Sequence, residues 1–171
     1  MAETKDIKIR PAVERDVPVI LGFVKRLAAY EKAAPHEVEA TEDLLVQNLF
    51  GPHPYAHVLL ASVNSNNNEE EEQVAGFALY FFNFSTWKGR PGLYLEDLFV
   101  DSEFRGLGIG KRLLIQLAAV AKERECGRME WVVLDWNEPA IKFYESLGAQ
   151  KMSEWIINRV AGQALSDLAE M

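Results

Sequence analysis

Residues 105–110 read Arg-Gly-Leu-Gly-Ile-Gly, and they separate a predicted strand, Leu93 to Val100, from a predicted helix, Gly108 to Cys126. The helix is predicted because apolar residues recur there every three or four positions. Closely spaced glycines let backbone amides approach a ligand, and the N-terminus of a helix adds positive potential. Arg105 can add a charge-assisted hydrogen bond. The stretch therefore predicts an anion-binding loop.

Two nucleotide-binding motifs fit this loop poorly. A Walker-type loop needs Ser or Thr after its Gly-Lys pair, but Lys111 is followed by Arg112. A dinucleotide fingerprint needs glycine at its sixth position, and counted from Gly106 that position is Lys111. The alternative to an anion site is a glycine-rich turn between strand and helix that holds no ligand.

The order of the predicted elements indicates one mixed α/β domain over residues 1–171, without repeats or linkers. Strands are predicted from alternation of apolar and polar residues, and helices from periods of three and four. The predicted strands are Ile7 to Arg10, His57 to Val63, Val74 to Phe84, Leu93 to Val100, Arg128 to Leu134 and Gln150 to Val160, and the predicted helices are Asp16 to Lys32, one that begins after the N-cap Thr41, Gly108 to Cys126 and Glu138 to Leu147. The Asn/Glu-rich stretch from Asn66 to Glu72 is interpreted as a mobile loop without a function.

The composition disfavours several classes of function. A net charge of −8, from 18 Lys and Arg against 26 Asp and Glu, disfavours nucleic acid and favours cationic partners. No apolar run approaches the ~18 residues that a membrane span needs, so a cytoplasmic protein without a membrane partner is expected. The single cysteine, Cys126, cannot form an intramolecular disulfide, which fits a reducing compartment. The three histidines lack the spacing of metal ligands, so no metal is expected.

The glycine loop resembles the pyrophosphate-binding motif Arg-x-x-Gly-x-Gly of the GNAT N-acetyltransferases, through Arg105, Gly108 and Gly110. Residues 94–100 (Tyr-Leu-Glu-Asp-Leu-Phe-Val) and 135–144 (Asp-Trp-Asn-Glu-Pro-Ala-Ile-Lys-Phe-Tyr) narrow the resemblance to the spermidine/spermine N-acetyltransferase group. The residues that favour its thialysine and plant ornithine or diaminopropane branch are Trp131, Asp135, Trp136, Glu154 and Trp155. The resemblance implies the GNAT fold, a mixed and mostly antiparallel sheet flanked by helices. It also implies acetyl-CoA as co-substrate, a small cationic amine as acceptor, and a homodimer.

Amide formation from acetyl-CoA requires a neutral amine, a stabilised oxyanion and a proton for the departing thiolate. An alkyl ammonium has a pKa near 10.4, so removing its proton at pH 7 costs about 4 to 5 kcal/mol. The resemblance implies that Glu96 accepts this proton through a water molecule and that Tyr144 is the general acid. A phenol with a pKa near 10 remains protonated at pH 7, which suits that acid role. Glu96 and Asp97 are neighbours on a strand and are expected on opposite faces, with Asp97 as a structural hydrogen-bonding group.

The resemblance also implies two sets of binding residues. Those implied in acetyl-CoA binding are Leu98, Phe99, Val100, Arg105, Gly106, Leu107, Gly108, Ile109, Gly110, Lys111, Asn137 and Tyr144. Those implied in amine binding are Tyr30, Glu31, Trp87, Glu96, Asp97 and Glu154, with Trp155 as a second aromatic face for an ammonium. The alternative for Asn137 is an N-cap of the following helix, and for the glutamates a solvated surface position. Backbone amides of residues 98–100 are implied to hold the pantetheine arm if the fourth and fifth strands diverge, which periodicity does not show.

Two other functions remain open at this point: acetylation of a protein N-terminus or lysine, and a non-catalytic acyl-CoA-binding module. No cysteine or serine lies in a nucleophile motif, which favours direct attack of the amine on acetyl-CoA. The sequence does not distinguish spermidine, thialysine, ornithine and diaminopropane, because discrimination among them depends on a few ångströms of pocket depth.

Overall fold

The computed structural model describes residues 6–64 and 72–171, and the chain divides into two compact units, Met1–Val132 and Val133–Met171. We call them the N-terminal and the C-terminal unit and describe each by itself. The Asn/Glu-rich stretch that was predicted as a loop lies, except for Glu72, outside the described residues.

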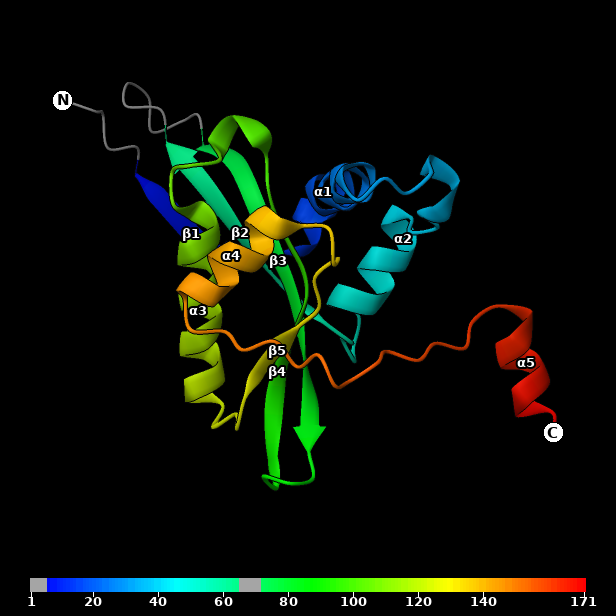
Figure 1. Ribbon diagram of the computed structural model, residues 1–171. Helices are drawn as coiled ribbons and strands as arrows, with labels where there is room; N and C mark the ends of the chain where they lie inside the picture. Colours follow the sequence, from blue (N-terminus) through cyan, green and yellow to red (C-terminus); the bar gives the residue numbers. More distant parts are fainter. Residues whose placement is uncertain (1–5, 65–71) are drawn as a thin grey trace. The chain divides into compact units, whose positions relative to one another are not determined.

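The N-terminal unit contains a five-stranded sheet with the strand order β1-β2-β3-β4-β5 (Figure 1). The strands are β1 (Ile7–Pro11), β2 (His57–Asn64), β3 (Glu72–Ser85), β4 (Arg90–Val100) and β5 (Met129–Trp131). Neighbouring strands from β1 to β4 are antiparallel, and β5 runs parallel to β4. The predicted class, a mixed and mostly antiparallel sheet with flanking helices, is confirmed.

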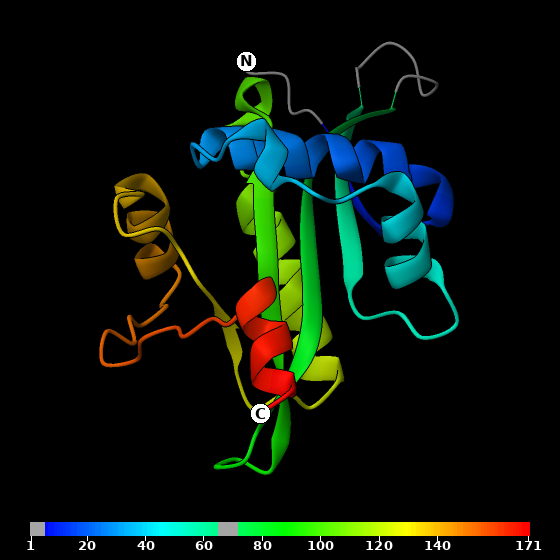
Figure 2. The ribbon, with the colours of Figure 1, turned by 90° about the vertical axis from the view of Figure 1, so that its right-hand side faces the viewer.

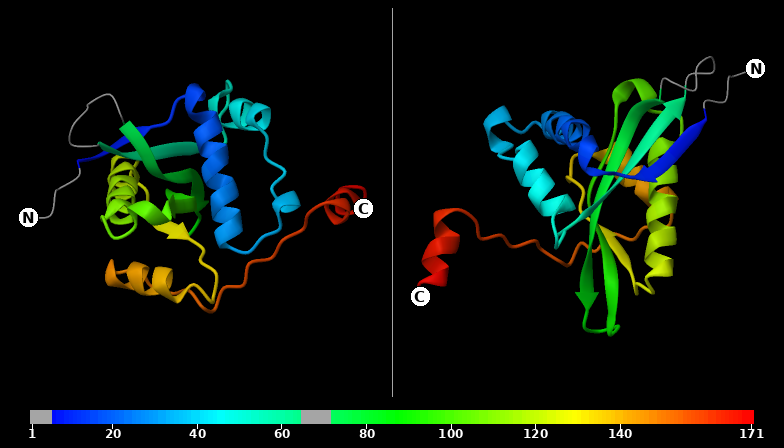
Figure 3. Two further views of the ribbon diagram at one scale, coloured as in Figure 1. Left: turned by 90° about the horizontal axis from the view of Figure 1, so that it is seen from above. Right: turned by 180° about the vertical axis from the view of Figure 1, so that it is seen from behind.

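In the described residues of this unit there are also three α-helices and four short helical turns. The α-helices are α1 (Val17–Tyr30), α2 (Glu42–Leu45) and α3 (Ile109–Glu123), and the short turns are η1 (Glu14–Asp16), η2 (Pro35–Glu37), η3 (Val46–Phe50) and η4 (Ser102–Phe104). Figure 2 shows α1 crossing the strands of the sheet. Helices α1 and α3 cover opposite faces of the sheet (Figure 3). The predicted N-cap of α2 is confirmed, because Thr41 Oγ1 accepts a hydrogen bond from the Leu44 N–H at 3.2 Å.

Apolar side chains fill both layers between sheet and helices. On the α1 face, the ring of Phe23 stacks on Phe77 with centroids 5.3 Å apart and meets Phe99 edge-on at 6.2 Å. On the α3 face, Leu113 and Leu117 are fully buried. Each such side chain contributes about 1.5–3 kcal/mol through burial, so this packing fixes the strands that carry the site.

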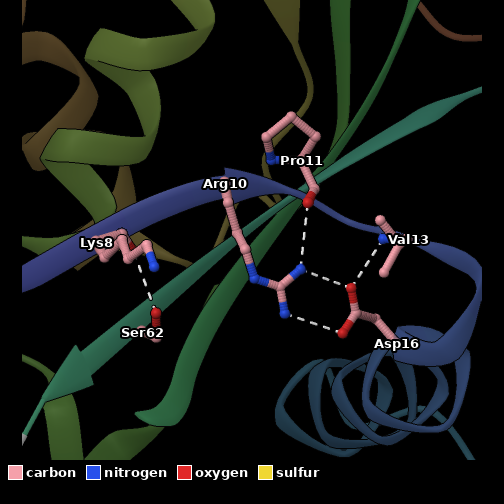
Figure 4. A network of polar contacts seen from close by, with 6 residues as sticks. All are labelled: Lys8, Arg10, Pro11, Val13, Asp16 and Ser62. Carbon is pink, nitrogen blue, oxygen red and sulfur yellow. Dashed lines mark hydrogen bonds and ion pairs between the residues drawn. The ribbon is translucent and has the colours of Figure 1, made fainter. Parts of the chain in front are cut away.

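A partly buried ion pair connects β1 with the start of α1 (Figure 4). The guanidinium of Arg10 donates two hydrogen bonds to the Asp16 carboxylate, at 2.7 and 3.0 Å, and the Val13 N–H donates a third at 2.8 Å. The Arg10 hydrogen bonds hold the pKa of Asp16 below its ordinary value. The charge of Asp16 therefore stabilises this corner of the fold.

The C-terminal unit contains α4 (Glu138–Ser146) and α5 (Gln163–Ala169). Gly148 ends α4 with φ +90°, and the Ala149 N–H donates to the Tyr144 carbonyl at 3.2 Å, as in a Schellman motif. The predicted helix and its glycine cap are confirmed.

Two strand predictions need correction. The predicted strand Arg128 to Leu134 forms only from Met129 to Trp131, where β4 provides a pairing partner. The predicted strand Gln150 to Val160 is wrong, since this segment contains no strand. A strand is stabilised by hydrogen bonds to a neighbouring strand, and the C-terminal unit offers none. No helix in the described part of the chain is long and apolar enough to cross a membrane.

Candidate active site

A β-bulge in β4 lies at the predicted proton acceptor. Leu79 of β3 pairs with Asp97, but the next residue, Tyr80, pairs with Leu95, so Glu96 is an extra residue without a partner on β3. A one-residue bulge shifts the alternation of side chains by one position. Asp97 therefore shares a face with Glu96, and this is the face that α1 covers through Phe99. The prediction that Glu96 and Asp97 point to opposite faces is wrong.

The pairing of β5 with β4 ends at the same point. The parallel pairing begins with Leu93 and Met129 and ends with Leu95 and Trp131, whereas β4 continues to Val100. Five residues of β4 thus follow the last pair. Within the described part of the N-terminal unit, these five residues have no strand partner on the β5 side, as the role implied for residues 98–100 requires.

The bulge also decides where the backbone N–H groups of β4 point. The Leu93 N–H donates to the carbonyl of Arg128, just before β5, at 3.0 Å. The Asp101 N–H donates instead to the carbonyl of Ala75 in β3, at 2.9 Å. In a regular strand both N–H groups would point the same way, because the two residues are separated by an even number of positions. After the bulge, the N–H groups of Leu98 and Val100 therefore point toward the side of β4 on which β5 no longer pairs. We call this side, from Glu96 to Val100, the open edge of β4.

The carboxylates of Glu31, Glu96 and Asp97 lie close enough to interact near the bulge. The pKa of Asp97 is raised to about 6, chiefly because burial disfavours its charged form, and further because the charges of Glu96 and Glu31 repel a third negative charge. Burial also raises the pKa of Glu31, the residue that caps the C-terminus of α1. This concentration of negative charge is suited to binding a cation such as an alkyl ammonium.

The glycine loop joins the end of β4 to α3. Gly106 and Gly108 have φ +80° and +81°, a left-handed conformation that only glycine adopts without strain. Gly108 is the N-cap of α3, and no side chain caps the helix there. The first intrahelical bond joins the Arg112 N–H to the Gly108 carbonyl at 3.0 Å, so the N–H groups of the three residues before it have no intrahelical partner. Backbone geometry here fits an anion, as predicted from the sequence.

Arg105 is tied to the strand that precedes the loop. Its Nε donates a hydrogen bond to the Val100 carbonyl at 3.0 Å. The residue that was predicted to contact the pyrophosphate is therefore anchored beside the open edge of β4.

Trp87 is not brought to the carboxylates. It lies in the turn before β4 and is 90% exposed. From Arg90 to Glu96 the strand advances six residues, or about 20 Å at 3.3 Å per residue. Within the N-terminal unit, Trp87, in the turn before β4, is thus well separated from Glu96.

The remaining predicted residues lie in the C-terminal unit. Asn137 caps α4, since its Oδ1 accepts a hydrogen bond from the Ala140 N–H at 3.4 Å, which confirms the N-cap alternative. Tyr144 lies in the second half of α4, where its ring contacts Phe143 with centroids 5.4 Å apart. Glu154 lies in the segment without a strand, and Trp155 beside it donates its backbone N–H to Met152 at 3.1 Å.

The model of the acetyltransferase (GNAT) family matches residues 25–149, a range that includes the glycine loop and α4. The chain belongs to the GNAT family. It is an acetyl-transferring enzyme, and the resemblance stated from the sequence motifs is confirmed.

Similar proteins support this membership. Thialysine N-epsilon-acetyltransferase of Bos taurus is 40% identical over 95% of this chain and 97% of its own length. L-ornithine N5-acetyltransferase of Arabidopsis thaliana is 30% identical over 96% of this chain and 88% of its own length. Among solved structures, an integron cassette protein from the mobile metagenome of V. cholerae superposes with a TM-score of 0.76 and 30% identity, over 96% of this chain and 98% of that one.

Among residues 6–64 and 72–171, no group of three or more His, Cys, Asp or Glu side chains is arranged so that it could hold a metal ion.

Proposed function

We propose that this GNAT enzyme transfers an acetyl group from acetyl-CoA to a primary amine of a small cationic molecule. The observation that carries the proposal is the bulge at Glu96, which gathers three carboxylates at the point where the pairing of β4 with β5 ends. An ammonium held by these carboxylates would lie next to backbone N–H groups able to polarise an acetyl carbonyl.

The open edge and the glycine loop fit acetyl-CoA, which supplies an activated acyl group when bound. The N–H groups of Leu98 and Val100 suit the amide-bearing pantetheine arm, and the start of α3 suits the pyrophosphate. In this proposal the other loop residues, from Arg105 to Lys111, surround the phosphates, and Phe99 supports the edge from the α1 face. Binding along this line would direct the acetyl group toward Glu96.

In the proposed reaction Glu96 accepts the proton of the ammonium, directly or through a water molecule. Without an acceptor the deprotonation costs about 4 to 5 kcal/mol at pH 7. Asp97 and Glu31 favour binding of the cation by their charge. The neutral amine then attacks the acetyl carbonyl, whose oxygen accepts hydrogen bonds from the β4 backbone.

We further propose that both units form one catalytic domain over residues 1–171. The family match crosses the boundary between the units, which supports this proposal. Tyr144 then donates a proton to the departing thiolate, as the phenol pKa permits. In this proposal Asn137 also contacts the CoA arm, and Glu154 belongs to the amine-binding residues.

The proposed acceptor amines are thialysine and ornithine, with polyamines and diaminopropane as further members of the class. Two relatives named above carry thialysine and ornithine in their names, and each of these molecules bears a side-chain amine. The three carboxylates recognise that amine in either case.

We also propose a cytoplasmic homodimer. The apolar run Trp155-Ile156-Ile157 lies in a segment without secondary structure, and burial against a second copy would remove it from water. Sedimentation equilibrium of the native protein and of Ile156→Glu tests the proposal, and a native monomer would contradict it.

The amine specificity is tested by free-thiol release from acetyl-CoA with spermine, spermidine, diaminopropane, ornithine, lysine, thialysine and a short peptide. We expect turnover of at least one free amine and little of the peptide. Turnover of the peptide alone would assign the enzyme to protein acetylation. Absence of turnover with tight CoA binding would indicate a binding module.

A further inference from the structure

The guanidinium of Arg105 lies against two aromatic rings. Its central carbon is 4.9 Å from the ring centroid of Tyr30 and 5.5 Å from that of Phe99. The two rings meet edge-on, with centroids 6.5 Å apart. Together with the bond from Nε to the Val100 carbonyl, these contacts define the position of the guanidinium at the entrance of the glycine loop. Both distances lie within the range of favourable cation–π contacts.

This arrangement leaves donors of Arg105 for a ligand. The Val100 bond uses one of the five N–H donors of a guanidinium, and contacts with ring faces use none. A long flexible side chain loses conformational freedom when it binds an anion, and a side chain already held in place loses less. Tyr30 therefore lowers the entropic cost of a contact that Arg105 makes with an anion.

We propose that Tyr30 is a positioning residue for acetyl-CoA, which acts by holding the guanidinium of Arg105 beside the end of β4, next to the glycine loop. The inference rests on the proposed function, because it takes the pyrophosphate of CoA as the anion. It assigns Tyr30 to the cofactor side of the site, whereas the sequence resemblance implied a place in the amine pocket. Glu31, the next residue, remains on the amine side with Asp97. The end of α1 thus contributes one residue to each half of the site.

A purely structural role for Tyr30 makes a different prediction. If Tyr30 only supported Phe99, its removal would disturb the β4 edge, and binding of any acetyl thioester would weaken in the same proportion. If Tyr30 acts through Arg105, its removal affects only ligands that carry the pyrophosphate. A double-mutant cycle and a truncated thioester separate the two roles.

The experiment measures CoA dissociation constants by calorimetry for the native protein, Tyr30→Phe, Tyr30→Leu, Arg105→Ala and the double variant Tyr30→Leu/Arg105→Ala. We expect Tyr30→Leu to weaken CoA binding three- to tenfold, while Tyr30→Phe, which keeps a ring face, retains most of the affinity. In the Arg105→Ala background, Tyr30→Leu should have no further effect. With S-acetylpantetheine, which lacks the pyrophosphate, Tyr30→Leu should leave KM unchanged.

Two results would overturn the inference: equal weakening by Tyr30→Leu with and without Arg105, or a rise in KM for the amine with CoA binding unchanged. Failure of the native protein to bind CoA would instead contradict the proposed function itself. Because Tyr30 is 38% exposed, its variants should fold, and thermal unfolding of each variant checks this.

Discussion

Glu96 and Asp97 lie on the same face of β4, although they are neighbours in the chain. Strand β3 pairs with the residues on both sides of Glu96 but not with Glu96 itself. The side chains of Glu96 and Asp97 therefore both lie near Glu31 at the end of α1. The same extra residue turns the N–H groups of the strand toward the edge that β5 leaves open. One irregularity thus accounts both for the cluster of carboxylates proposed to bind an amine and for the N–H groups proposed to polarise a carbonyl.

The first prediction concerns how much the buried charge of Asp97 lowers the free energy of unfolding. The pKa of Asp97 is about 6 in the folded protein and near 3.9 in an unfolded chain. Between these values the unfolded state ionises first, so the cost of the Asp97 charge to folding accumulates from pH 4 to pH 6 and stays constant above. Asp97→Asn should therefore raise the free energy of unfolding at pH 7.5, by at most about 3 kcal/mol, and have little effect below pH 4. Urea unfolding at both values checks this, and an equal change at both would contradict it.

The second prediction concerns Asp16 and has the opposite sign. Its pKa is lowered by the Arg10 hydrogen bonds, so its contribution to stability is present above the unfolded pKa near 3.9 and is lost as pH falls through the folded value. Asp16→Asn should destabilise the protein by about 1–3 kcal/mol at pH 7, because the charge-assisted hydrogen bonds between Arg10 and the carboxylate are lost. The difference from the native protein should shrink below pH 4. Glu39→Gln, a change at an exposed carboxylate, is the control and should shift neither curve.

The third prediction concerns the glycine loop. A methyl group at Gly108 meets open space, but φ +81° costs an alanine about 1–2 kcal/mol, so Gly108→Ala should distort the start of α3 and weaken CoA binding at least tenfold. Gly89→Ala is a matched control, because Gly89 has φ +59° and open space in the turn before β4. Calorimetric titration with CoA should separate the two variants. A similar loss of CoA affinity in both would show that the loop is not the anion site.

Local sequence signals predicted the parts of the fold that depend on neighbouring residues. The helical period from Ile109 to Glu123 and the glycines that require positive φ are properties of a few consecutive residues. The N-cap at Thr41 and the glycine cap at Gly148 were predictable for the same reason. These signals were sufficient to predict the backbone conformation of the glycine loop.

Features that depend on distant pairing were not predictable in this way. The bulge at Glu96 depends on how β3 and β4 align, and nothing in residues 94–100 alone reveals the extra residue. The contact of Arg105 with Tyr30 joins residues 75 positions apart. The segment from Gln150 to Val160 has strand-forming residues, but it forms no strand because the unit that contains it has none to pair with.

The central claim is that Glu96 removes the proton of a bound ammonium before acetyl transfer. The most direct test is the pH dependence of kcat/KM for the best free amine, from pH 6.5 to pH 10, with the native enzyme, Glu96→Gln and the control Glu39→Gln. The account predicts that kcat/KM of Glu96→Gln is at least tenfold below that of the native enzyme at pH 7. The difference in kcat/KM should disappear toward pH 10, where the amine loses its proton without a base. Equal rates of native enzyme and Glu96→Gln at pH 7 would contradict it.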